Sequence, residues 1–339
     1  MPVFSLSHHA HYQCRHAGAC CKAGWHIPVE TLLQPRLGTA VIEPDATGTC
    51  SRYDEHEHRC RVHRDLGESS LPLACDQFPR VSLTDTRGTF IVLSHFCPTA
   101  AGMLFDSSDL RIVRDPVAFP ASRRYDGLDA SGAWAPLVRE RLLFGLDDYT
   151  RWEIWMVETL ASAATAPRAL ARIAHAAEQL RTWTPADGPF AAWLEHTCAE
   201  SREDDELPRG LYDDLTSPDI VSEIPWRHGD ISRPSQADRV APPALPALPS
   251  CESALRRYLA GKAFASWCAY QGRGIRTTVA EIVVSHTVLL SELSTVISEA
   301  GHDADAAMFT RAVRAADWRL VHGLDRGEFT AWLGRVETR

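Results

Sequence analysis

The sequence lacks the surplus of positive charge that is typical of a general nucleic-acid-binding protein. Acidic residues number 44 against 35 basic ones, and the formal net charge of the 339-residue chain is −9. Lysine is scarce as well, because Lys22 and Lys262 are the only two among the basic residues. We therefore expect no nucleic acid among the partners of this protein.

A secretory leader and a long hydrophobic run are also missing. The first residues, Met-Pro-Val-Phe-Ser-Leu-Ser-His-His, contain neither a basic region nor an apolar stretch of about 7–15 residues. The most apolar stretch, 279–297, is interrupted by polar residues and falls short of the roughly 18 apolar residues of a membrane span. We expect a cytoplasmic protein with no membrane partner. In that reducing compartment, dense cysteines more often bind metal than form disulfides.

Cysteine is abundant by contrast, and it is concentrated in the N-terminal third. Seven of the ten cysteines lie between residues 14 and 97, namely Cys14, Cys20, Cys21, Cys50, Cys60, Cys75 and Cys97. Their spacing matches neither the paired cysteines of zinc fingers nor the regular run of bacterial ferredoxins. Thiolates suit zinc and iron–sulfur clusters and exclude magnesium and calcium. Spacing alone leaves open an iron–sulfur cluster, a zinc site, or cysteines that only contribute to packing.

The adjacent pair Cys20 and Cys21 bears on that choice. Neighbouring side chains of an extended backbone point to opposite sides, so two adjacent thiolates more easily reach different metal atoms. This arrangement favours a cluster of several metal atoms over a single ion. Seven thiols exceed the four that one centre needs, so some of them are expected to lie beside the ligands or to form part of another site.

Histidines near these cysteines are less distinctive candidates. His56, His58 and His63 flank Cys60 and could bind metal, although we expect at least two of them to be solvated loop residues. Further along the chain, His322 lies near a predicted helix end, where a helix-dipole or capping role is favoured over acid–base chemistry.

Three cysteines and one histidine are expected in the helical core. His286 lies on the apolar face of its predicted helix. Cys198, Cys251 and Cys268 also fall on predicted helices, where cysteine behaves as a small apolar residue.

The pattern of apolar residues predicts a mainly α protein whose N-terminal third differs from the rest. Residues 1–105 are rich in cysteine, histidine, glycine and proline, which indicates loops, turns and a short strand or two, the best of them at 89–96. Helical periodicity begins near residue 134. It predicts helices over 137–163, 169–183, 190–198, 251–271, 277–299 and 305–323.

These patterns divide the chain into four regions. We expect a metal-binding or cluster-binding region to pack on a helical bundle and to be cross-linked by its metal. The regions are a Cys-rich segment at 1–105, a helical region at 106–200, an acidic and Pro-rich linker at 201–250 and a C-terminal helical region at 251–339.

Three sequence blocks surround the cysteines. The first, at 12–30, contains Cys-Cys-Lys-x-Gly-Trp; the second, at 60–80, contains Leu-Gly-Glu and ends in Phe-Pro-Arg; the third, at 94–101, contains Ser-x-x-Cys-Pro. In order and spacing the blocks resemble the flagellin lysine-N-methylase family, and more widely a group of cysteine-cluster proteins described as zinc or iron chelators. The chain departs from that family by lacking a cysteine between Cys14 and Cys20 and by having Asp76 where an arginine is frequent.

The resemblance implies an S-adenosylmethionine-dependent N-methyltransferase that holds a [4Fe-4S] cluster through these cysteines. Its substrate would be the amine of a lysine-bearing protein or of a small molecule. Arg80 and Trp25 are the candidate cofactor-binding residues, Arg80 as a clamp for a carboxylate and Trp25 as a cover over the metal centre. No Gly-x-Gly-x-x-Gly follows a strand, and no residue is indicated as catalytic.

Two other functions stay open at the level of sequence. One is a zinc or iron chelator without catalysis, in which the cysteines stabilise the fold or store metal. The other is a cluster-dependent enzyme that modifies small molecules in a biosynthetic pathway.

Overall fold

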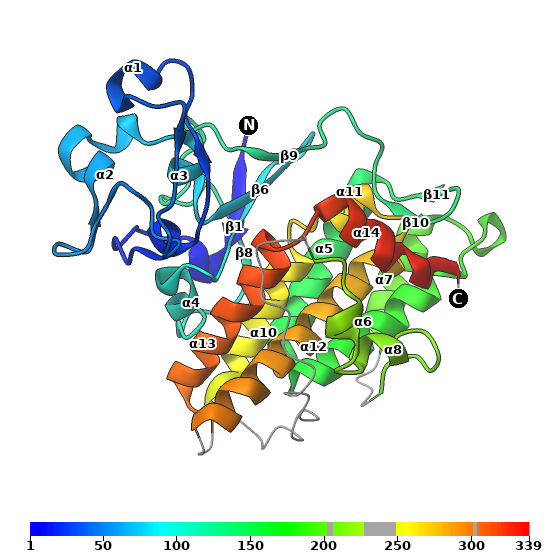
Figure 1. Cartoon of the computed structure of the whole chain (residues 1–339). Coiled ribbons are helices and arrows are strands. Elements are labelled where there is room, and N and C mark those ends of the chain that lie inside the picture. The colour runs from blue at the N-terminus through cyan, green and yellow to red at the C-terminus, as the bar shows by residue number, and fades with distance from the viewer. Residues whose placement is uncertain (202–205, 227–248, 301–303, 339) are drawn as a thin grey trace.

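The computed structural model describes residues 1–201, 206–226, 249–300 and 304–338. About 52% of the chain is helical and 13% is in strands, which confirms the prediction of a mainly α protein. Figure 1 shows the N-terminal strands and short helices gathered at one end of a layer of long helices.

The strands include a five-stranded sheet, which packs against the long helices. Its strand order is β8 (Ile112–Arg114), β1 (Val3–Leu6), β7 (Gly88–Leu93), β6 (Arg80–Asp85) and β9 (Gly127–Asp129). β1 and β7 run parallel, whereas β6 and β7 form an antiparallel hairpin. The strand predicted at 89–96 is therefore present as β7. The sheet is larger than the one or two strands expected, because β1, β8 and β9 are too short to leave a clear alternation in the sequence.

The segment between β1 and β6 folds into short elements around a small apolar core. That core consists of Ile27, Val29, Leu37, Ile42 and Val62. The elements are η1 (Ser7–His9), η2 (Ala19–Lys22), β2 (Ile27–Pro28), α1 (Gln34–Leu37), β3 (Val41–Ile42), β4 (Tyr53–Asp54), β5 (Arg59–Cys60), α2 (Arg61–Leu66), η3 (Glu68–Ser70) and α3 (Leu73–Gln77). The short helix α4 (Pro98–Met103) follows β7. So few buried side chains leave this segment dependent on additional contacts for its stability.

All six predicted helices are present in the remainder of the chain. They are α5 (Leu146–Ser162), α6 (Ala166–Arg181), α7 (Phe190–Glu200), α10 (Pro249–Ala263), α12 (Ile275–Ala300) and α13 (Ala306–Asp317). Shorter elements connect or follow them, namely β10 (Leu137–Arg139), β11 (Leu142–Leu143), η4 (Pro185–Asp187), α8 (Asp213–Thr216), α9 (Ile220–Glu223), α11 (Cys268–Gln271), η6 (Trp318–His322), α14 (Arg326–Leu333) and η7 (Gly334–Thr338).

Three of the predicted helices have different bounds in the structure. The stretch 137–163 begins as the β10–β11 hairpin, whose turn holds Arg141 at φ 62°. The stretch 251–271 is broken at Ala265, which has φ 58° and donates its N–H to Glu153 Oε1 at 3.1 Å. The stretch 305–323 changes at Trp318 into a π-helical turn. In each case a local backbone change interrupts an apolar periodicity that continues in the sequence.

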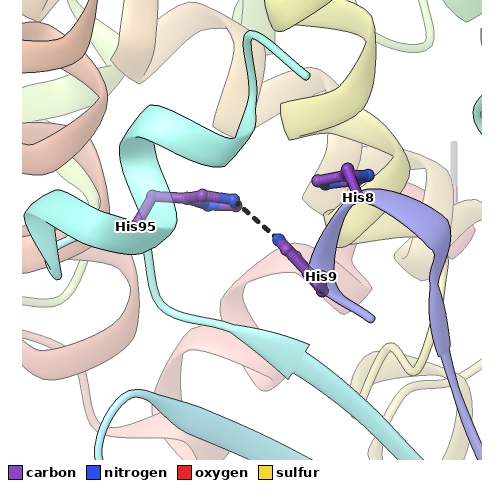
Figure 2. Close-up of side chains that lie close together, drawn as sticks. All are labelled: His8, His9 and His95. Atoms are coloured by element: carbon purple, nitrogen blue, oxygen red, sulfur yellow. Dashed lines mark hydrogen bonds between the residues drawn. The ribbon is translucent and has the colours of Figure 1, made fainter. Parts of the chain in front are cut away.

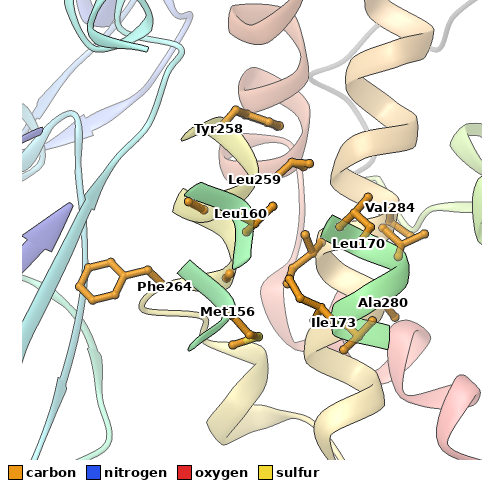
Figure 3. Close-up of a cluster of buried hydrophobic side chains, with 14 of the residues drawn as sticks. Met156, Leu160, Leu170, Ile173, Tyr258, Leu259, Phe264, Ala280 and Val284 are labelled. Atoms are coloured by element: carbon orange, nitrogen blue, oxygen red, sulfur yellow. The ribbon is translucent and has the colours of Figure 1, made fainter. Parts of the chain in front are cut away.

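The helices bury one large core around α12. Figure 3 shows Leu160 of α5, Ile173 of α6, Leu259 of α10 and Val284 of α12 meeting in this core. α12 is long and apolar enough to cross a membrane by length and composition, yet 67% of its most apolar 18-residue window is buried inside the fold. That burial is typical of the core helix of a soluble protein.

The predicted linker at 201–250 is described only in part. Residues 202–205 and 227–248, which include most of the Pro-rich stretch, lie outside the described residues. The part that the structure describes contains α8 and α9, whose buried Leu215 and Ile220 join the helical core.

Candidate metal centre

All seven N-terminal cysteines line the same cavity, which has a volume of about 100 Å³. The structure thus brings together thiols that are up to 83 positions apart in the sequence. The cavity lies among the short elements of the N-terminal segment, and all seven of its cysteines are free thiols. Such a concentration of thiols at one point is the main chemical feature of this part of the molecule.

Local backbone geometry places the first cysteines. Gly18 adopts φ 72° and starts the 3-10 turn η2, which carries Cys20 and Cys21. The N–H of Cys50 donates to the carbonyl oxygen of Cys21 at 2.7 Å, so two distant segments are joined directly at the cavity. Cys14 lies in the loop that leads into this turn.

Short helices place the remaining cysteines. Cys60 and Cys97 occupy the positions immediately before α2 and α4, and Cys75 lies within α3. The free N–H groups at the start of a helix favour negative charge, and a cysteine there ionises more readily. Cys60 is therefore held where its thiolate is stabilised, with the backbone N–H groups of Val62 and His63 among the causes of its lowered pKa.

The expectation of an extended backbone at Cys20 and Cys21 is wrong. Both residues belong to a helical turn, and Cys21 hydrogen-bonds through its side chain with Cys20 and with Cys60. The two neighbouring thiols therefore face the same cavity. Cys20 and Cys21 do not point to opposite sides of the chain, because the turn directs both side chains toward the cavity.

The thiols differ in how readily they ionise. The hydrogen bond from Cys21 lowers the pKa of Cys60 to about 6 and also lowers the pKa of Cys20, whereas the donor Cys21 has a raised pKa. Burial raises the pKa of Cys14, Cys50 and Cys75. Cys60 is thus favoured as a thiolate at neutral pH, and the thiols with a raised pKa need a cation nearby to lose their protons.

The spacing of the sulfur atoms bears on the type of metal. Four thiolates around one tetrahedral zinc ion, at about 2.3 Å each, would lie about 3.8 Å apart. Within the described ranges, the one set of three or more His, Cys, Asp or Glu ligand atoms that all lie within 4.8 Å of one another consists of histidines. No three of the cysteine sulfurs therefore approach each other that closely. Pairs of these sulfurs still lie within hydrogen-bonding distance, because Cys21 contacts both Cys20 and Cys60.

Polar side chains surround the cysteines. The Tyr12 hydroxyl lies 3.8 Å from Cys97 Sγ, and burial raises the pKa of Tyr12. His16 and His63 line the cavity as a pair, with 3.3 Å between their Nδ1 atoms. His56 and His58 are exposed, which confirms the expectation that two of the three histidines beside Cys60 are solvated.

A second cavity, of about 350 Å³, lies on the other side of Trp25 and Phe78. These two aromatic residues line both cavities and so form the wall between them. Trp25 packs against Phe78 at 5.5 Å between ring centroids and against His322 at 4.9 Å, and it stacks on Trp318 at 5.8 Å. We call this second cavity the groove. Trp25 thus lies beside the cysteine cavity, and its role as a cover over a metal centre stays a prediction.

Arg80 lies at the floor of the groove. Its Nη1 donates to the Asp76 carbonyl oxygen at 2.9 Å, and its guanidinium lies 5.7 Å from the centre of the Tyr12 ring. Its Nε is buried and has no hydrogen-bond partner among the residues that the structure describes. Burial lowers its pKa, but arginine stays charged at neutral pH. Arg80 therefore presents a positive charge and an unused donor close to the cysteine cavity.

His322 lines the same groove, and its setting differs from the prediction. It does end a helical segment, but its ring faces the aromatic side chains, and its Nε2 lies 3.0 Å from Ser94 Oγ. Burial lowers its pKa to about 4. A neutral imidazole gives no charge–dipole stabilisation at a helix end, so the predicted helix-dipole role is not the one that the structure supports.

The other predicted core residues lie in the helical part. Cys251 and Cys268 are buried and Cys198 is half-buried, as expected. His286 lies near the middle of α12 and is half-buried as a residue, but its Nε2 is fully buried and has no hydrogen-bond partner among the described residues. Sequence reasoning missed Phe96 and Trp318 as walls of the aromatic cluster. The position of Phe96 directly before Cys97 was an available signal, whereas Trp318 had none.

No family model, no curated protein and no solved structure matches this chain. The function is therefore inferred from the residues of the site and from the resemblance of the three cysteine blocks to the flagellin lysine-N-methylase family.

Proposed function

We propose that this protein binds a [4Fe-4S] cluster in the cysteine cavity and methylates a lysine or another primary amine with S-adenosylmethionine. One observation carries the cluster: seven cysteines from separate short elements line one cavity, more than the four thiolates that one zinc ion binds. The methyl-transfer reaction is supported by the resemblance of the three sequence blocks and by the groove behind Trp25.

Four of the cysteines are the preferred cluster ligands. Electrostatic interactions connect Cys75 with Cys20, Cys50 and Cys60, which makes these four a mutually close set. A [4Fe-4S] cluster uses four cysteine ligands. The remaining three would then be neighbours of the ligands, with Cys21 as the hydrogen-bond donor that supports two of them.

The groove offers two features that methyl transfer requires, a positive charge for the cofactor and an apolar wall that excludes water. When bound, the cluster would have each of its four iron atoms coordinated by one of these cysteines, so the residues of the groove would have to hold S-adenosylmethionine. Arg80 provides a positive charge for the carboxylate of that cofactor. Trp25 and Phe78 exclude water from one wall, and the neutral His322 does not repel the incoming ammonium group, which must release a proton before its nitrogen attacks the methyl group. Reactants must lie within about 3–3.5 Å in a dry site for transfer to be fast.

Anaerobic purification followed by metal and sulfide analysis tests the cluster. We expect a brown protein with about four iron and four sulfide per chain. Cys75→Ser should lose most of this content, while Cys198→Ser, a half-buried cysteine of α7, should keep it. A colourless wild-type protein with stoichiometric zinc would instead support a chelator and contradict the proposal.

Binding and product formation test the reaction. We expect calorimetry to show S-adenosylmethionine binding that Arg80→Gln weakens by roughly 10–100-fold, because hydrogen bonds to charged groups contribute about 1.5–3 kcal/mol. Mass spectrometry of lysine peptides and small amines incubated with the holoprotein should show methylated products, absent with Cys75→Ser. A protein that carries the cluster and binds the cofactor but methylates no amine would exclude the methyltransferase function and leave another cluster-dependent reaction.

A further inference from the structure

Three histidines meet in the interior, away from the cysteine cavity. His8 and His9 form the η1 turn after β1, and His95 follows β7. Figure 2 shows the three rings pointing toward one another. All three are buried, with exposed fractions of 0%, 0% and 2%. Because β1 and β7 are parallel neighbours in the sheet, their ends place these residues side by side.

We propose that His8, His9 and His95 form a second metal site, which binds a divalent transition-metal ion such as Zn²⁺. Three imidazole nitrogens are a ligand set that zinc and its neighbours prefer. One nitrogen from each residue lies within 4.8 Å of the others. This site is independent of the proposed cluster and of the proposed reaction.

The distances fit a shared ion. Nε2 of His9 lies 3.2 Å from Nε2 of His95. Two imidazole nitrogens bound to one tetrahedral zinc ion at about 2.0–2.1 Å would lie about 3.3 Å apart. The ring centroids of His8 and His9 are 4.1 Å apart, so the third ring is near enough to complete the set after a small rotation.

The protons of His95 are arranged for metal binding. Its Nδ1 lies 3.1 Å from Asp317 Oδ2, and a carboxylate can only accept, so Nδ1 carries the proton. The Nε2 lone pair of His95 therefore faces His9. A histidine whose outer nitrogen donates to a carboxylate is the usual arrangement around a bound metal, because the carboxylate fixes the ring and increases its basicity.

Asp317 is itself held firmly in place. Its Oδ1 accepts from Lys262 Nζ at 2.5 Å and from the Tyr258 hydroxyl at 3.2 Å. Burial opposes its ionisation, but Lys262 and His95 outweigh that effect and keep the pKa of Asp317 well below its usual range. The residue that orients His95 is therefore an ionised carboxylate with satisfied partners.

Three buried ring nitrogens of His8 and His9 have no hydrogen-bond partner among the described residues, as expected of side chains that bind a metal ion. They are both ring nitrogens of His8 and Nδ1 of His9. A buried polar atom left without a partner costs about 1–3 kcal/mol. Burial also holds the pKa of His8 and His9 well below the usual value, so both are neutral. Neutral imidazole is the form that binds metal.

Two positive side chains limit the affinity of this site. Lys262 lies against Asp317, and the charge of Arg257 acts on His8. Both oppose a cation, so binding depends on the coordination bonds of the three imidazoles. Removal of the Lys262 charge should consequently strengthen metal binding, whereas a purely structural histidine cluster would show no such response.

Zinc binding by the untagged full-length protein tests the site. After incubation with Zn²⁺ and desalting, we expect one zinc ion per chain with nitrogen or oxygen neighbours at about 2.0–2.1 Å in the zinc-edge X-ray absorption spectrum. Zinc held by the cysteines would show sulfur at about 2.3 Å instead. Cys75→Ser should leave the nitrogen-bound zinc in place.

Histidine variants assign the ion to these residues. His9→Gln should lose the nitrogen-bound zinc, His196→Gln on the surface of α7 should keep it, and Lys262→Met should bind it more tightly. Circular dichroism checks that each variant is folded; if His9→Gln is not, the wild-type spectrum and Lys262→Met decide. Wild-type protein that retains no nitrogen-bound zinc, or a folded His9→Gln that retains it, would overturn the proposal.

Discussion

Burial decides the chemistry of several single side chains in this protein. It lowers the pKa of His322 and of His286 to about 4, and it raises that of Tyr12. A charged group in a poorly solvated place is costly, so the neutral form is favoured in each case. The same principle raises the pKa of the thiols of Cys50 and Cys75.

The pH dependence of stability follows from His286. Its folded pKa of about 4 lies below the unfolded value of about 6.5, so the unfolded state gains a proton first and stability falls as the pH drops from 6.5 toward 4. We expect the loss of unfolding free energy between pH 7.5 and pH 5, measured with urea, to be about 2 kcal/mol smaller in His286→Leu than in wild type. The exposed His196→Gln should behave as wild type. An equal loss in His286→Leu would show that this residue does not titrate on unfolding.

At the level of elements, capping residues determine where some helices begin, and a break in the backbone determines where another ends. Thr165 and Asp305 begin α6 and α13 by accepting a backbone N–H, and Pro167 stands in the first turn of α6. These are signals that a sequence carries openly. The break at Ala265 is different, because it depends on the buried Glu153 that receives the freed N–H.

The cap of α13 offers a test at this scale. Asp305 Oδ1 accepts from the Met308 N–H at 2.8 Å. Asp305→Ala should lower the free energy of unfolding by about 1 kcal/mol, while Asp305→Asn should keep most of it, because asparagine also caps helices well. Urea unfolding of the three proteins measures both effects. If alanine and asparagine destabilise equally, the cap contributes little.

At the scale of the whole molecule, the sheet and the helices share one core. Leu6, Leu83 and Phe90 of the sheet belong to the same cluster as the helices. Phe90 meets Phe264, which follows α10, in an edge-to-face contact at 5.8 Å, and Figure 3 shows Phe264 pointing away from the helices toward the strands. Leu6 of β1 and Phe90 of β7 therefore pack against the helical layer. Residues of both candidate metal sites follow these two strands in the sequence.

This shared core predicts coupled unfolding. Phe264→Ala should lower the free energy of unfolding by about 3–5 kcal/mol. A double-mutant cycle with Phe90→Ala should give a coupling of about 0.5–1.5 kcal/mol. Urea unfolding followed by tryptophan fluorescence and by helical circular dichroism should show a single common transition. Separate transitions for the two signals would mean that the sheet and the helices fold independently.

The sequence alone was sufficient for the features that repeat or crowd together. The periodicity of Leu146–Ser162 and Ile275–Ala300 predicted two core helices, and the seven crowded cysteines predicted a metal site. The helix prediction is confirmed because its signal is local: a helix exposes its period within one turn. The metal site stays a prediction, although the structure does bring the seven cysteines to one cavity. The three-residue strands β8 and β9 left no such signal.

What only the tertiary structure decided depends on contacts between distant segments. The inward rotation of Cys20 and Cys21, the groove shared by Trp25 and His322, and the meeting of His8 with His95 all arise where separate elements pack. A sequence pattern records the preference of a residue for a surface or a core. The neighbour across that core, and hence the charge state and the ligand that a buried side chain accepts, is set by packing alone.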